Sequence, residues 1–160
     1  MTTNLIYSDI SSDTSSIGLG ASERTLRSVL TALSKGKFSE AVGRFDDHFT
    51  FIDQALDLEF TEKERLTEFF RKSRELFPDT ALEIESTFAY GDHAAAEWKL
   101  TAMQTEFIIW NQTFQVPIVV RGSTIVCFDN GRVIRWSEYY DHFTSRRYRL
   151  AGMFKEWTEY

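Results

Sequence analysis

The alternation of apolar and polar residues after Asn130 and Gly131 predicts a β-strand. Asn-Gly is a strong hairpin signal because both residues tolerate the positive φ of a tight turn. Side chains alternate between the two faces of a strand, and one row of this strand consists of Ile134, Trp136, Glu138 and Tyr140. If this row faces the interior, Glu138 is a carboxylate among aromatic side chains. Such surroundings raise the pKa of a carboxyl group and suit it to proton transfer.

Apolar residues at helical spacing predict three helices in the first half of the chain. The first is predicted to run from a cap at Ser22 to Gly36, with a face formed by Leu26, Val29, Leu30 and Leu33. The second is short and gathers on one face Phe38, Ala41, Val42 and Phe45. The third begins with a capping box at Thr61 to Glu64 and ends before Pro78. Its buried side is formed by Leu66, Phe69, Phe70 and Leu76 or Phe77.

Residues 49–60, between the second and third helices, have the pattern of an extended segment. One row contains Phe49, Phe51, Asp53 and Ala55, so Asp53 is, like Glu138, an acid among aromatic residues. The other row is also apolar and leaves the facing of the segment open; it contains Ile52, Leu56, Leu58 and Phe60. Three later alternating runs, 82–90, 94–106 and 116–128, are predicted to form a four-strand antiparallel meander with the strand that follows Gly131.

The order of these elements predicts a single α+β domain over residues 22–160. A strongly curved, mostly antiparallel sheet wrapped around about three helices makes a cone that is open at one end, and the interior of such a cone is an apolar pocket. Residues 1–21 are rich in Ser and Thr and are predicted to be a flexible arm. After Asp141 a last helix is predicted to bury Leu150, Met153 or Phe154, and Trp157.

Composition and charge narrow the classes of function. Aromatic residues make up 15% of the chain, and large rings fill cores or line pockets for apolar ligands. The net charge of -6 argues against a nucleic-acid partner. Three scattered histidines and one cysteine predict neither a metal site nor a disulfide, and Cys127 is interpreted as a small buried residue rather than a nucleophile. Without a signal sequence or a membrane-length apolar run, we expect a cytoplasmic protein without membrane partners.

Three motifs resemble the nuclear transport factor 2-like superfamily, which includes SnoaL-like polyketide cyclases, ketosteroid isomerases and limonene-epoxide hydrolases. They are F-D-D-H-F-T-F-I-D at 45–53, E-R-L-T-E-F-F on the third helix, and F-D-N-G-R-V-I-R-W-S-E-Y-Y-D at 128–141. The resemblance covers about residues 24–143. It implies the cone fold, a cavity for a small hydrophobic molecule, and a homodimer packed through the outer face of the sheet.

The resemblance also implies roles for the two acids. Asp53 falls where ketosteroid isomerases place the Asp that shuttles the proton, a position at which limonene-epoxide hydrolases have an Asn. Glu138 falls in the W-x-acid position where epoxide hydrolases and SnoaL-like cyclases hold a catalytic Asp. The chain departs from the isomerases at the two oxyanion-binding positions, where it has Val29 and Thr124 in place of Tyr and a protonated Asp.

The strand over 94–102 has two possible registers. Epoxide hydrolases need an Arg and an Asp two residues apart there, and this chain has either Trp98 and Leu100 or Lys99 and Thr101. Neither pair reproduces the Arg and Asp of the epoxide hydrolases. Alternation alone does not choose between the registers, because the outer face of the sheet could be buried in a dimer.

We therefore expect a cofactor-independent isomerase or cyclase in which Glu138 and Asp53 share acid–base catalysis; dehydration and epoxide hydrolysis rank below these. The ligand is expected to contact Trp98, Phe51, Trp136, Tyr140 and Lys99. The alternatives are structural. Glu138 could pair with Arg135 or Lys99 at the sheet surface, Asp53 could bond a loop amide, Asp141 could cap the last helix, and the chain could be a non-catalytic binding or assembly module.

Overall fold

The computed structural model describes residues 20–108 and 112–141, with the backbone alone at 104–108 and 112–116. The helices are α1 (Ala21–Ser34), α2 (Phe38–Val42) and α3 (Lys63–Leu76). The strands are β1 (Phe45–Asp53), β2 (Leu58–Phe60), β3 (Ala81–Tyr90), β4 (His93–Ile108), β5 (Gln112–Asp129) and β6 (Arg132–Tyr140). The predicted last helix, and all but the end of the predicted arm, lie outside the described residues.

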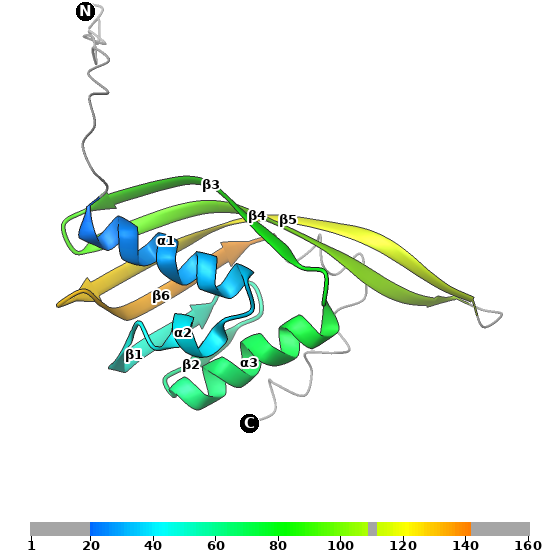
Figure 1. Ribbon diagram of the computed structural model, residues 1–160, viewed down its shortest axis with the longest axis horizontal. Coiled ribbons are helices and arrows are strands. Elements are labelled where there is room, and N and C mark those ends of the chain that lie inside the picture. The colour runs from blue at the N-terminus through cyan, green and yellow to red at the C-terminus, as the bar shows by residue number, and fades with distance from the viewer. Residues whose placement is uncertain (1–19, 109–111, 142–160) are drawn as a thin grey trace, which may run out of the picture.

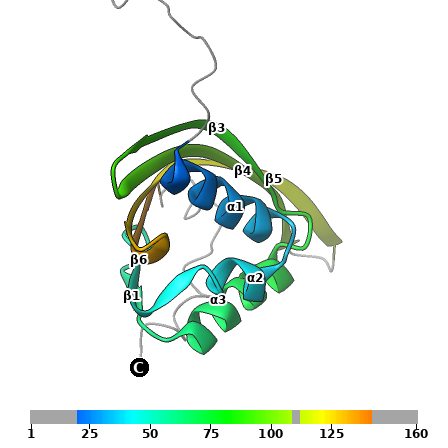
Figure 2. The same ribbon diagram turned by 60° about the vertical axis from the view of Figure 1, so that its left-hand side comes forward.

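The strands form one curved, unclosed sheet in the order β2-β1-β6-β5-β4-β3. Neighbouring strands are antiparallel except β1 and β6, which run parallel. Figures 1 and 2 show this sheet wrapped around the helices, with α1 in its hollow and α2 and α3 closing the opposite side. The α+β cone and the meander from β3 to β6 are therefore as predicted. Asn130 and Gly131 make the β5–β6 turn with φ of 48° and 78°.

The register places the inner-face side chains in successive rows across the sheet. The deepest row is apolar and consists of Phe51, Trp136, Val126 and Ala94. The next is partly polar and consists of Asp53, Glu138, Thr124 and Ala96. The third consists of Tyr140, Gly122 and Trp98. The deepest row packs with Leu26, Val29 and Leu30 of α1 in the main core. The rows therefore change from buried apolar core to pocket wall along the cone.

Three local predictions are wrong. Helix α1 is capped two residues earlier than expected, at Gly20 rather than Ser22, so Ser22 lies in the first turn and its hydroxyl donates to the carbonyl of Gly91 (2.8 Å). Helix α3 has Glu62 as N-cap and no side-chain cap, so the expected capping box does not form. Phe45 belongs to β1 rather than to α2. In each case tertiary contacts or a shift of one or two residues overrode a local signal.

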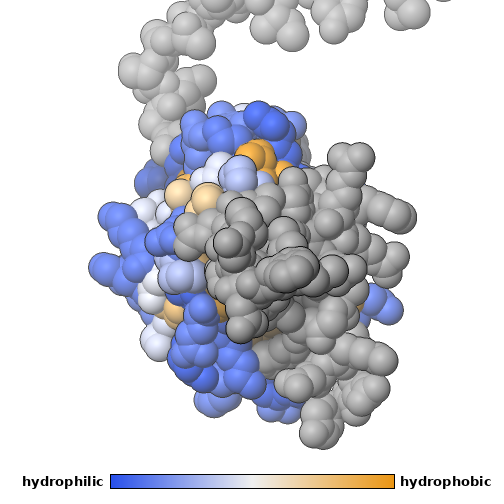
Figure 3. Space-filling model, turned by 90° about the vertical axis from the view of Figure 1, so that its right-hand side faces the viewer, coloured by the Kyte–Doolittle hydropathy of each residue, from blue (hydrophilic) through white to orange (hydrophobic). Residues whose placement is uncertain are grey.

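The outer face of the sheet carries a row in register across five strands that is apolar except for one serine and consists of Phe88, Ala95, Ile125, Ser137 and Ile52. Phe88 is 68% exposed, and Tyr90, two residues along β3, is 82% exposed. Cys127 is half-buried on the same face, less enclosed than expected. By contrast, the described surface in Figure 3 is mostly hydrophilic. The expected homodimer through the outer face stays a prediction.

No described helix is long and apolar enough to cross a membrane.

Candidate active site

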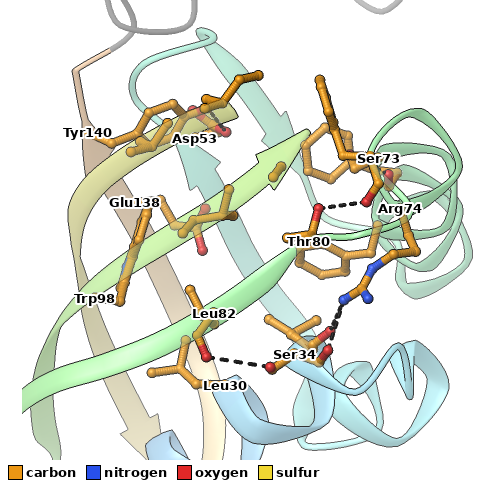
Figure 4. A pocket seen from close by; sticks show the side chains of 18 of the residues that line it. Leu30, Ser34, Asp53, Ser73, Arg74, Thr80, Leu82, Trp98, Glu138 and Tyr140 are labelled. Carbon is orange, nitrogen blue, oxygen red and sulfur yellow. Dashed lines mark hydrogen bonds between the residues drawn. The ribbon is translucent and has the colours of Figure 1, made fainter. Parts of the chain in front are cut away.

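A cavity of about 230 Å³ lies between the inner face of the sheet and the three helices. Figure 4 shows it from close by. Its walls are mainly aliphatic and aromatic side chains of β4, β5, α1 and α3. The polar groups among the described residues that line it are Ser34, Asp53, Ser73, Arg74, Thr80, Glu138 and Tyr140. A mostly apolar cleft with a few polar groups is the usual form of a small-molecule site.

The sheet register brings the two predicted acids, Asp53 and Glu138, together. They are Cα partners in the parallel ladder between β1 and β6, and neighbouring strands lie about 4.8 Å apart. Both line the cavity. Asp53 is 2% exposed, whereas the Glu138 side chain is partly exposed. Residues 85 positions apart in the sequence therefore form one carboxyl pair.

Hydrogen bonds hold Asp53 in a fixed orientation. Its Oδ1 accepts from the backbone N–H groups of Ala55 and Leu56, at 3.0 Å each. Its Oδ2 accepts from the hydroxyl of Tyr140 at 2.9 Å. The loop-amide alternative and the pocket alternative thus both hold for this residue. The turn over residues 54–57, which separates β1 from β2, supplies the two amides.

Glu138 is the acid whose protonation state the site changes most. Burial and, to a lesser degree, the negative charge of Asp53 raise the pKa of Glu138 from 4.5 to about 8, against a smaller lowering by the indole of Trp136. That indole N–H donates to Oε1 at 2.9 Å. Glu138 is therefore mainly a neutral acid at pH 7. Burial also raises the pKa of Tyr140, so its hydroxyl stays protonated and donates to Asp53.

The surface-pairing alternative for Glu138 is wrong. Arg135 alternates to the outer face and is exposed. Lys99 is on the outer face as well, where its Nζ lies 2.5 Å from Glu83. The β4 register is therefore the one that turns Trp98 and Leu100 inward, and Lys99 does not line the pocket.

Trp98 forms a fixed wall of the pocket. Its indole N–H donates to Oγ1 of Thr124 at 2.9 Å, and its ring centroid lies 6.0 Å from that of Tyr140. The ring lies over Gly122, where an added Cβ would be 2.5 Å from two indole carbons. Thr124, at one of the two oxyanion-binding positions of the isomerases, is thus engaged by the indole. Val29, at the other, is fully buried in the core.

Phe51 and Trp136 lie in the deepest row rather than in the pocket wall. Both are 0% exposed and pack with ring centroids 6.4 Å apart. Trp136 still reaches the site through its bond to Glu138. Of the five predicted ligand-contact residues, Trp98 and Tyr140 line the pocket and Lys99 lies outside it. Phe51 and Trp136 are buried in the core next to the pocket wall.

Comparison with known proteins decides the family. Residues 26–136 match the model of the SnoaL-like domain. The chain belongs to the SnoaL-like family. A search of curated proteins found no match.

Solved structures share the fold of this SnoaL-like protein at low sequence identity. IdmH from Streptomyces antibioticus, provisionally described as a polyketide cyclase, is 11% identical with a TM-score of 0.68, over 79% of this chain and 96% of that chain. AclR from Streptomyces galilaeus, provisionally described as a hydroxylase, is 16% identical with a TM-score of 0.65, over 81% and 96%. A protein from Shewanella putrefaciens, provisionally described as a SnoaL-like polyketide cyclase, is 13% identical with a TM-score of 0.67, over 81% and 96%.

Sequence reasoning about this SnoaL-like protein missed Arg74. This half-buried residue on α3 lines the pocket, and its Nη2 donates to the carbonyls of Leu33 (3.1 Å) and Ser34 (2.9 Å). A signal was present. Arg74 follows Phe70 by four residues, which places it on the buried stripe of the helix. Among the residues that the structure describes, no cluster of three or more potential metal ligands occurs.

Proposed function

We propose that this SnoaL-like protein is a cofactor-independent enzyme that binds a small hydrophobic cyclic molecule and catalyses its cyclisation or isomerisation. Glu138 is the proton donor. The observation that carries the proposal is a carboxyl group with a pKa of about 8 at the sheet side of an apolar cavity. A neutral acid in such surroundings donates a hydrogen bond or a proton to a carbonyl oxygen at the moment negative charge develops on it.

Asp53 acts on this donor through its charge. Two neighbouring carboxyl groups do not both ionise readily, so one of them retains its proton. The hydrogen bonds that Asp53 accepts from described residues favour a carboxylate there, and its charge contributes to the raised pKa of Glu138. At neutral pH the proton of this pair therefore resides on Glu138. Pairs whose pKa values are pushed apart supply the acid and base roles of a proton-transfer site.

In an intramolecular aldol cyclisation, the enol carbon of the substrate attacks a carbonyl carbon and a C–C bond forms. The carbonyl oxygen takes the proton of Glu138 and becomes a hydroxyl group. The enol oxygen loses its proton, which returns to the pair and restores the acid. In an isomerisation, Glu138 protonates the carbonyl oxygen while the Asp53 carboxylate takes a proton from the α-carbon, which gives an enol. The enol oxygen then returns its proton to Glu138 as another carbon takes the proton held by Asp53, so both carboxyl groups regain their starting states. Neither reaction requires an oxidant or a cofactor.

The second candidate is a binding module of the same fold without catalysis. Val29 and Thr124, at the two oxyanion-binding positions of the isomerases, are a core residue and a hydrogen-bond partner of Trp98. This arrangement leaves Glu138 as the acid without either of the two oxyanion donors of the isomerases. A binding module would take up ligands without accelerating proton transfer.

Hydrogen–deuterium exchange separates the two candidates without knowledge of the natural substrate. The probe is 2-tetralone, whose α-hydrogens exchange with D₂O and are followed by NMR. The enzyme is expected to accelerate this exchange, and Glu138→Gln to reduce the acceleration by about a hundredfold or more. Glu83→Gln, which removes an exposed carboxylate of the outer face, serves as the matched control.

The pH profile tests the assigned role. Because the pKa of Glu138 is raised to about 8, the acid form is present below that pH and is lost as the pH rises through it. The enzymatic rate should therefore decline above pH 8. Equal rates in the wild-type protein and Glu138→Gln remove Glu138 from the mechanism. Binding of 2-tetralone without acceleration favours the binding module.

A further inference from the structure

We infer that the ligand of the pocket carries a carboxylate, and that Arg74 binds it. The inference rests on the proposed function in taking this cavity as the ligand site, and it names the substrate class as a cyclic, mostly apolar carboxylic acid. It does not depend on which proton transfer Glu138 performs.

Backbone carbonyl groups, rather than a carboxylate, hold the side chain of Arg74 in place. Its Nη2 spans the carbonyls of Leu33 and Ser34 in the last turn of α1, where the helix dipole favours a positive charge. Within the described part of the chain, no carboxylate lies within ion-pair distance of Arg74. Arg71, one turn earlier on α3, is bound by Glu68 and Glu75. The two arginines of one helix thus have different partners.

The guanidinium of Arg74 has donors beyond the two bonds that hold it. The group carries five N–H donors in a planar fork, and the two backbone carbonyls are bound by Nη2. The N–H groups of Nε and Nη1 remain for a ligand. Because the fork is already held in place, binding a planar carboxylate costs little side-chain entropy. Charge-assisted bonds of this kind are the stronger ones in proteins.

The charges around the cavity set the orientation of an anionic ligand. Among the described lining residues Arg74 is the one cationic side chain, and Asp53 and Glu138 are the acids. Figure 4 shows Arg74 on the helix side of the pocket, and Asp53, Glu138 and Tyr140 on the sheet side. A carboxylate is repelled at the acidic side and attracted at Arg74, so the carbonyl that reacts is presented to Glu138 while the apolar rings lie between the two sides.

Titration calorimetry with a pair of matched probes tests the assignment. The probes are 2-naphthoate and 2-naphthamide, which have the same ring and nearly the same shape but differ in charge. At pH 6.5, where Glu138 is protonated, the wild-type protein is expected to bind the carboxylate at least about tenfold more tightly than the amide. Equal affinities, or no binding of either probe, overturn the inference.

Variants test whether Arg74 causes the preference for 2-naphthoate over 2-naphthamide. Arg74→Gln should bind both probes equally, and Arg74→Lys should keep part of the preference because it keeps the charge. Arg71→Gln, on the same helix, should retain all of it. A folded Arg74→Gln that still prefers the carboxylate overturns the inference; if that variant does not fold, Arg74→Lys and the wild-type comparison decide it.

Glu138→Gln separates this inference from the proposed function. This variant should keep the preference for naphthoate while losing acceleration of exchange in 2-tetralone. Loss of catalysis with an intact preference supports both ideas. An intact preference in a wild-type protein that accelerates no exchange removes the catalytic function and leaves the carboxylate site standing.

Discussion

Replacement of Glu138 by Gln should stabilise the protein at neutral pH. The carboxyl group has a pKa of about 8 in the folded protein, against an ordinary value of 4.5. The unfolded chain therefore releases this proton at a lower pH than the folded protein does. A glutamine has no proton to release, and its side-chain oxygen still accepts the bond from the indole of Trp136. The variant thus removes the cost of keeping an acid protonated in the fold.

The sign and size follow from proton linkage. Below pH 4.5 Glu138 is protonated in both states and costs nothing; above that pH the wild-type protein loses stability with rising pH, and the loss levels off above pH 8. Each pKa unit corresponds to about 1.4 kcal/mol, so the variant gains at most about 3 kcal/mol at pH 7. Solvent that enters the pocket screens part of this, because Glu138 is only partly buried.

Urea unfolding followed by tryptophan fluorescence, at several values of pH between 4 and 9, measures the difference. The stability of Glu138→Gln relative to wild type should be near zero at pH 4 and rise with pH. Glu83→Gln is the control of opposite sign, since Lys99 lowers the pKa of the exposed Glu83. Its small stability loss should be present at neutral pH and vanish on acidification. A Glu138→Gln protein no more stable than wild type at pH 8, or a gain independent of pH, refutes the reasoning.

Two further substitutions test the architecture of the pocket. Gly122→Ala places a Cβ 2.5 Å from the Trp98 ring and 2.7 Å from the carbonyl oxygen of Tyr139; we expect a loss of about 1–3 kcal/mol in thermal unfolding, unlike Gly20→Ala, where no atom lies within 4 Å. Tyr140→Phe removes the hydroxyl that donates to Asp53 and should cost about 1–3 kcal/mol in urea unfolding; unchanged stability would show that this bond contributes nothing net.

Alternation in the sequence was sufficient to place Glu138. A strand that is polar on one face and aromatic on the other has one stable orientation. β6 follows that rule from Trp136 to Tyr140, whereas at its start a register shift buries Val133 of the other row. Asp53 was harder, because both rows of its segment are apolar. The turn after β1 explains this: Ile52 lies on the outer face, whereas Leu58 and Phe60 belong to β2 and are buried.

Depth within the cone could not be predicted from alternation. Phe51, Trp136 and Tyr140 share the inward facing, yet only Tyr140 lines the pocket. Which inward residue meets the cavity depends on the cross-strand rows and on where the helices end, and both are properties of the assembled sheet. Arg74 was missed for a related reason, since a charged residue on a buried stripe indicates neither a cavity nor the carbonyls that hold it.

The parallel contact of β1 with β6 determines when the site can exist. Strand β6 fits between β1 and β5, so Asp53 lacks the strand that carries Glu138 and Tyr140 until the ribosome has synthesised and released residues 132–140. A nascent chain that ends before β6 therefore lacks Glu138 and Tyr140 and has no capacity for this proton transfer. Such long-range pairings form late because loop closure must come first. Binding of a pocket ligand is consequently a direct report that β6 has taken its place between β1 and β5.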